Sequence, residues 1–201
     1  MRTLLAASAI ACLASSASAQ PHVHNGVDAP ADQASGAAFQ SFAGACAPNL
    51  SRPEVMQLVM GAVGLQKAND RVMAAVPHED GENVWVLQEA GVGVAAVWKP
   101  DATRCRVLLQ RGDLDQLRRD FSTLLTDTAK PGLAVDKVQD VRNSQGAGGP
   151  VETLAYAVYA TPKSAGSDER LYTLTLYRGE NPKVAAVIEG RRISGVGRPA
   201  S

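Results

Sequence analysis

Residues 83–127 read NVWVLQEAGVGVAAVWKPDATRCRVLLQRGDLDQLRRDFSTLLTD, and this stretch sets the expected fold. Residues 84–88, 94–98 and 104–110 are short apolar or alternating runs rich in β-branched side chains. Turn segments that contain glycine or proline separate the three runs. Runs and turns of this kind predict an antiparallel meander of three strands.

An amphipathic helix is predicted directly after this meander. Asp113 is a good N-cap, and Gln116 three residues later completes a capping-box pattern. Five apolar side chains then recur at helical spacing: Leu114, Leu117, Phe121, Leu124 and Leu125. We expect this helix to lie across one face of the sheet, where each buried apolar side chain contributes roughly 1.5–3 kcal/mol before entropy.

The flanking segments extend the pattern in both directions. Helical spacing predicts two earlier helices at 37–47 and 53–63, the second with an apolar stripe of Val55, Leu58, Val59, Ala62 and Val63. Runs typical of strands follow the central helix at 133–142, 151–161, 171–178 and 183–189. The expected fold class is α+β, with an antiparallel sheet of about six to seven strands packed against two or three helices.

Residues 1–19 are predicted to be a secretory signal peptide. Arg2 supplies the positive start, and an apolar run too short to anchor in a bilayer follows it. Cleavage near Ala19 predicts a periplasmic or secreted protein. Lipid attachment at Cys12 is the alternative, but the preceding residues 9–11 lack the leading leucine of a lipidation box, so we expect a soluble product.

The rest of the chain is expected to form one folded domain with disordered termini. The predicted segments are a disordered leader at 20–36, a single α+β domain at 37–194 and a disordered tail at 195–201. Removal of Arg2 with the signal leaves 19 basic and 20 acidic residues, a formal charge of −1. This balance argues against nucleic acid as a partner, and no apolar run after the signal is long enough to span a membrane.

Two cysteines, Cys46 and Cys105, remain after removal of the signal. An isolated pair in an oxidising compartment is most simply one disulfide. Two thiolates without a neighbouring His or Cys do not complete a four-ligand zinc site. We therefore predict a disulfide that pins the first helix to the sheet, and we predict no metal or other cofactor.

The cysteines also belong to a wider pattern. Phe42 lies four residues before Cys46, and Trp98 lies seven residues before Cys105, with Asp113 and Phe121 following. These spacings resemble a family of small exported proteobacterial proteins of unknown function. The resemblance covers roughly residues 39–125; it implies an exported location and the cysteine pair, and it supplies no catalytic residue.

Catalytic candidates are few. His78 is the only histidine in the predicted domain, and Asp80 lies close to it in a polar loop. A hydrolase that uses this pair is one hypothesis, and a solvent-facing turn is the favoured interpretation. The chain contains no G-x-S-x-G or H-E-x-x-H motif to support a hydrolase.

We therefore predict a non-catalytic module that binds or inhibits another periplasmic or envelope protein. Aromatic side chains dominate interface energetics, so the candidate binding residues are Trp85, Tyr156, Tyr159, Tyr172 and Tyr177. Each of these is also a good core or cross-strand residue, which is the favoured interpretation. The alternatives to a binding module are the hydrolase that uses His78 and a structural accessory protein of the envelope.

Overall fold

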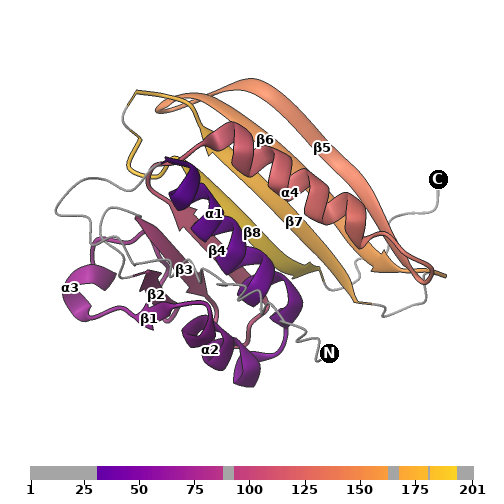
Figure 1. The fold of residues 1–201 in the computed structure, drawn as a ribbon, viewed down its shortest axis with the longest axis horizontal. Coiled ribbons are helices and arrows are strands. Elements are labelled where there is room, and N and C mark those ends of the chain that lie inside the picture. The colour runs from indigo at the N-terminus through magenta and orange to yellow at the C-terminus, as the bar shows by residue number, and fades with distance from the viewer. Residues whose placement is uncertain (1–30, 88–92, 163–167, 181, 194–201) are drawn as a thin grey trace, which may run out of the picture.

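The computed structural model describes residues 31–87, 93–162, 168–180 and 182–193, which contain one eight-stranded antiparallel sheet and four α-helices (Figure 1). The strands are β1 (Leu65–Lys67), β2 (Asn83–Leu87), β3 (Val94–Trp98), β4 (Arg104–Leu109), β5 (Leu133–Gly146), β6 (Gly149–Ala160), β7 (Glu169–Tyr177) and β8 (Ala186–Ile193). The helices are α1 (Ala31–Ser41), α2 (Pro53–Ala62), α3 (Asp70–Met73) and α4 (Leu114–Thr128). A π-helical turn, η1 (Phe42–Cys46), and a 3-10 turn, η2 (Ala47–Asn49), continue α1.

The sheet consists of two meanders joined by their last strands. Its strand order is β1-β2-β3-β4-β8-β7-β6-β5, so consecutive strands pair within β1–β4 and within β5–β8. The single connection between the meanders is the antiparallel pairing of β4 with β8, in which Cys105 lies opposite Gly190.

The predicted sheet of about six to seven strands with two or three helices is wrong. The described residues form eight strands and four α-helices. The unpredicted strand β1 has three residues and the unpredicted helix α3 has four. Both are shorter than the window over which hydrophobic periodicity can be recognised.

The predicted leader is also too long at its C-terminal end. Helix α1 begins at Ala31, so residues 31–36 belong to the fold. Ser35 is buried, and its hydroxyl donates to the backbone oxygen of Asp113 at 2.9 Å. Small side chains let α1 pack there without the large apolar period that the prediction required. The predicted signal peptide, Cys12, the first part of the leader and the predicted tail lie outside the described residues.

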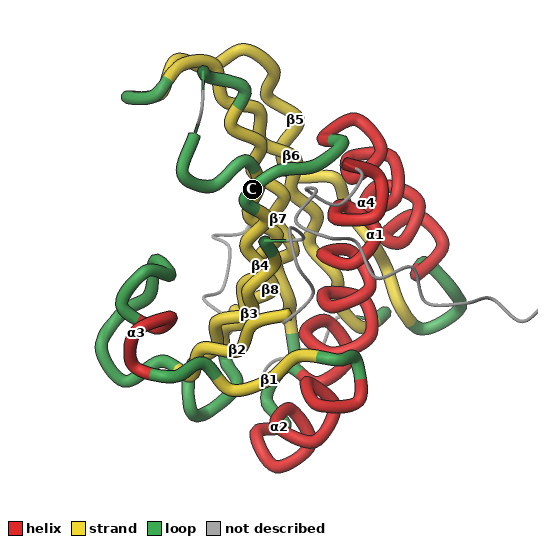
Figure 2. The backbone as a smooth tube through the Cα atoms, turned by 60° about the vertical axis from the view of Figure 1, so that its left-hand side comes forward, coloured by secondary structure: helices red, strands yellow, loops and turns green. Residues whose placement is uncertain are grey.

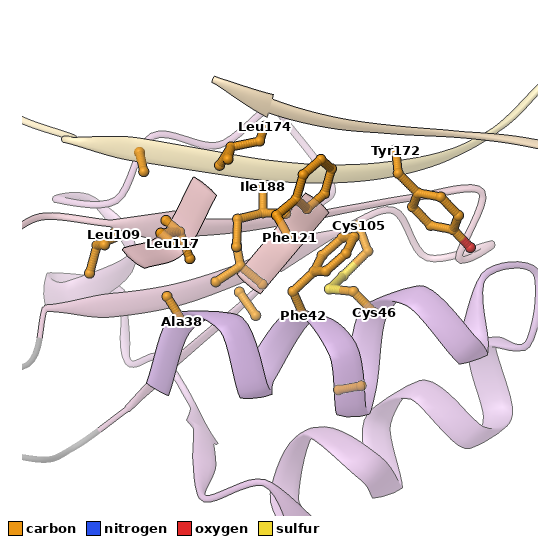
Figure 3. Packing of buried hydrophobic residues seen from close by; sticks show 14 of the residues in the cluster. Ala38, Phe42, Cys46, Cys105, Leu109, Leu117, Phe121, Tyr172, Leu174 and Ile188 are labelled. Atoms are coloured by element: carbon orange, nitrogen blue, oxygen red, sulfur yellow. A yellow bond between two sulfur atoms is a disulfide. The ribbon is translucent and has the colours of Figure 1, made fainter. Parts of the chain in front are cut away.

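One face of the sheet, called here the helix face, carries the main core. Helices α1 and α4 lie side by side on it (Figures 1 and 2). The Phe42 ring lies 6.0 Å from the Phe121 ring and 5.8 Å from the Tyr172 ring, measured between centroids (Figure 3). The Phe121 ring also lies 6.0 Å from the Tyr156 ring, so aromatic side chains connect both helical segments to β6 and β7.

A disulfide joins Cys46 to Cys105, which confirms the predicted pair. Their Cα atoms lie 5.6 Å apart, and both residues are fully buried. Cys46 ends η1 and Cys105 lies on β4, so the crosslink ties the N-terminal helical segment to the sheet beside Phe42 (Figure 3).

The opposite face, called here the outer face, is covered more thinly. A small second core lies on the first meander: Val84, Ala95, Val97 and Leu108. Helix α3 lies on this side, away from α1 and α4 (Figure 2). Met73 and Val76 pack onto the small core, so a single helical turn and the segment after it supply this cover.

Candidate functional site

The two predicted catalytic residues do not form a catalytic pair. His78 and Asp80 are both exposed, and the His78 Nδ1 atom lies 2.8 Å from the backbone oxygen of Val76 in the same turn. No hydrogen bond or ion pair joins His78 to Asp80 among the residues that the structure describes. A general base needs a proton-bearing group or an orienting acid within hydrogen-bond reach, and this geometry supplies neither.

Glu82 is the acid of this loop that forms buried ion pairs with the sheet. Its side chain is 2% exposed, with the Arg104 guanidinium at 2.7 Å and the Arg106 guanidinium at 2.5 Å. Burial alone would raise the pKa of Glu82, but the Glu79 N–H, which donates to it at 2.8 Å, and the two guanidiniums outweigh burial and hold its pKa below the usual range. These contacts fasten the loop onto the outer face. The sequence-based interpretation of a solvent-facing turn at His78 and Asp80 did not identify this role of Glu82.

The aromatic candidates do not gather into one binding surface. Tyr156 and Tyr172 are buried, and their hydroxyls lie 2.9 Å from Ser122 Oγ and 3.2 Å from the Ala47 backbone oxygen. Trp85 is half-buried against the same core. Two tyrosines remain partly exposed, at opposite ends of the β6–β7 pairing: Tyr159 and Tyr177.

A polar groove of about 480 Å³ lies between α4 and the β5–β6 hairpin. Arg118 contacts Asp140 at 2.5 Å, and Arg178 contacts Glu152 at 2.7 Å and Asp115 at 2.5 Å. Hydrogen bonds from these guanidiniums lower the pKa values of Asp140 and Asp115. Each acid of this groove is therefore paired with an arginine, and the five basic side chains of the described lining exceed its three acids by two.

A second groove, of about 700 Å³, lies on the outer face and has an apolar floor. We call it the outer groove. Its floor is a cross-strand row, because Val86 pairs with Ala95 and Ala95 pairs with Leu108. Ala95 and Leu108 are nearly buried, and Val86 is half-buried. Pockets of this size with an apolar lining are typical of small-molecule sites.

Two different segments form the walls of the outer groove. Val72 and Val76 belong to α3 and the turn that follows it, and Val184 precedes β8. The rim carries two cations, Arg71 on the α3 side and Lys183 on the β8 side. No Asp or Glu belongs to the described lining. The outer groove is thus apolar inside and positive at its edge.

Sequence reasoning missed the outer groove for an identifiable reason. The floor strands were predicted, but the groove exists only because α3 covers part of those strands. A four-residue helix has no readable period, although Asn69 is an N-cap whose Oδ1 accepts from the Val72 N–H at 3.0 Å. The Asn69 cap is the feature of the sequence that indicates α3, which forms one wall of the outer groove.

Two further properties limit the chemistry of the described residues. They contain no group of three or more His, Cys, Asp or Glu side chains arranged to hold a metal ion. None of their helices is long and apolar enough to cross a membrane.

No protein-family model matches the chain. A search of curated proteins finds no matching relative.

Proposed function

We propose that this protein is an exported, non-catalytic binding module that holds a small ligand with an apolar body in the outer groove. The observation that carries the proposal is the groove of about 700 Å³ above the apolar row of Val86, Ala95 and Leu108, of which Val86 is half-buried and the other two are buried. An apolar hollow that is open to water favours a ligand that can bury apolar area there.

Export is supported by two observations. The residues at 1–19 have the composition of a secretory signal. The buried Cys46–Cys105 disulfide suits an oxidising compartment such as the periplasm or the cell exterior.

The proposal departs from the sequence-based hypothesis in the nature of the ligand. The sequence predicts a protein partner on the basis of five aromatic residues, but three of them pack in or against the core. A protein-binding or inhibitory role, or a structural role in the envelope, stays a prediction. The hydrolase that uses His78 has less support, because His78 contacts only the backbone of its own turn among the described residues.

The experiment is binding of a neutral, environment-sensitive dye such as Nile red. Wild-type protein should enhance its fluorescence. Ala75→Trp, which fills the groove from an exposed wall position, should weaken dye binding by about tenfold. The matched control is Ala62→Trp, an exposed position at the end of α2 and outside the lining.

Two results would overturn the proposal. One is the absence of saturable dye binding to the wild-type protein. The other is equal binding by Ala75→Trp and Ala62→Trp, provided that circular dichroism shows both to be folded.

A further inference from the structure

The charged residues in the described lining of the outer groove all have the same sign. Arg71 comes from the α3 wall and Lys183 from the wall that precedes β8, so one cation stands on each side of the apolar floor. The remaining lining residues are apolar or uncharged. A ligand whose body lies on Ala95 and Leu108 therefore meets positive charge where it emerges into solvent.

These two cations differ from the paired arginines of the polar groove and of the loop that contains Glu82. Arg118 and Arg178 contact carboxylates in the polar groove, and Arg104 and Arg106 contact Glu82. Within the part of the chain that the structure describes, neither Arg71 nor Lys183 has a carboxylate at ion-pair distance. Clustered charge that is not neutralised internally raises the local concentration of oppositely charged ligands.

The polar neighbour on the α3 side also favours an anion. Asn69 lines the groove, and its Oδ1 is already engaged because it accepts from the Val72 N–H. The free end of this side chain is its NH2 group, which is a hydrogen-bond donor. A donor on the same wall as Arg71 suits a carboxylate and disfavours a positively charged head group.

We propose, building on the function proposed above, that the ligand is a single-chain amphiphile with an anionic head group, of which a fatty carboxylate is the simplest example. The chain lies across the row of Val86, Ala95 and Leu108, which spans two strand spacings, about 10 Å. The head group lies between Arg71 and Lys183. The apolar floor selects the chain, and the rim selects the charge.

The test is titration calorimetry with decanoate and with decanol, which share the chain and differ in charge. Decanoate should bind the wild-type protein more tightly than decanol. Arg71→Gln with Lys183→Gln should weaken decanoate binding by about tenfold and leave decanol binding unchanged. The matched control is Arg52→Gln with Lys67→Gln, which removes the same charge from exposed positions outside the lining and should bind decanoate like the wild type. Methyl NMR shifts at Val86, Leu108 and Val184 should report the chain in the groove.

The possible results distinguish a failure of the anionic-ligand proposal from a failure of the proposed binding function. Equal affinity for decanoate and decanol, or full decanoate binding by the Arg71→Gln, Lys183→Gln variant, overturns the anionic ligand but leaves an apolar binding module. Absence of binding by both ligands, together with failure of the dye to bind, overturns both proposals. Decanoate binding that shifts no methyl group of the groove overturns the assigned site.

Discussion

The two faces of the sheet are closed by different means. On the helix face, α1 and α4 bury the rings of Phe42 and Phe121, and a disulfide ties the N-terminal helical segment to β4. On the outer face of the first meander, a four-residue helix and a loop held by Glu82 form the cover. Large side chains fill the centre of the first face, with the polar groove of about 480 Å³ beside α4, and the second face has an apolar-floored groove of about 700 Å³.

This difference shows how one face of a sheet can stabilise the fold while the other face offers a surface for binding. A face that is packed to the density of a protein interior contributes most of the stability. A face that is covered by few residues contributes less stability and keeps apolar surface within reach of solvent. Four sets of substitutions, one of which is also followed as a function of pH, test this difference through their effect on stability.

Phe121→Ala should have the largest effect, because it empties the centre of the helix face. Phe121 is fully buried and contacts the rings of Phe42 and Tyr156. Truncation of a buried phenylalanine removes about 3–5 kcal/mol from the free energy of unfolding, which urea denaturation measures. A loss below about 1 kcal/mol would contradict the assignment of the main core to this face.

Cys46→Ser with Cys105→Ser should have the next largest effect. The crosslink spans 59 residues, for which the chain-entropy model gives at most about 4 kcal/mol. Intact mass with and without reductant, after alkylation, establishes the bridge, and thermal unfolding measures its contribution. Ligand affinity at the outer groove should not change, because the disulfide lies on the other face. A wild-type melting temperature in the double variant would show that the bridge does not stabilise the fold.

Glu82→Gln should have an intermediate effect on stability, since it weakens the ion pairs that hold the loop against the outer face. Hydrogen bonds between charged groups contribute roughly 1.5–3 kcal/mol, and a glutamine would replace one of the two carboxylate oxygens that Arg104 and Arg106 contact by an NH2 group and remove the negative charge. The matched control is Asp80→Asn, two residues away and exposed, which should change stability by less than about 0.5 kcal/mol.

The contribution of Glu82 should also depend on pH. Because the folded-state pKa of Glu82 lies below its unfolded value of about 4.3, its contribution is fully present above that value and is lost as pH falls through the folded pKa. The difference in unfolding free energy between the wild type and Glu82→Gln should therefore shrink as pH is lowered below about 4. A difference that stays constant over that range would contradict the charged state of Glu82 as the cause.

Leu58→Gln should have the smallest effect, below about 0.5 kcal/mol. Leu58 lies on α2 and is 75% exposed, whereas Met60 in the same helix is fully buried. Met60→Gln is the matched control and should be strongly destabilising. Comparable losses in both variants would indicate that Leu58 is covered in solution.

The central stretch was the most predictable part of the fold. Its strands β2, β3 and β4 and its helix α4 lie within a residue or two of the predicted positions, and the Asp113 side chain accepts from the Asp115 and Gln116 N–H groups as an N-cap should. These elements are long enough to show their own periodicity, and turn and cap residues mark their ends.

Elements that depend on distant partners were less predictable. The apolar stripe on α2 was assigned to the face of Leu58, but the buried side chains are Met56 and Met60, because the turns η1 and η2 determine which face of α2 is covered. The candidate site was missed for the same reason. The outer groove is defined by where α3 lies on the sheet, and Glu82 is buried by arginines 22 and 24 positions later in the chain.

The position of β8 has a consequence for the synthesis of the chain. All other strands precede β8 along the chain, yet it lies fifth across the sheet, between β4 and β7. A ribosome or a translocation channel releases the N-terminal end of a chain first. Until residues 186–193 emerge, β4 and β7 each present an unpaired edge, and open edges pair readily with other chains. The edges of β4 and β7 therefore stay open until the last described strand of the chain has been made.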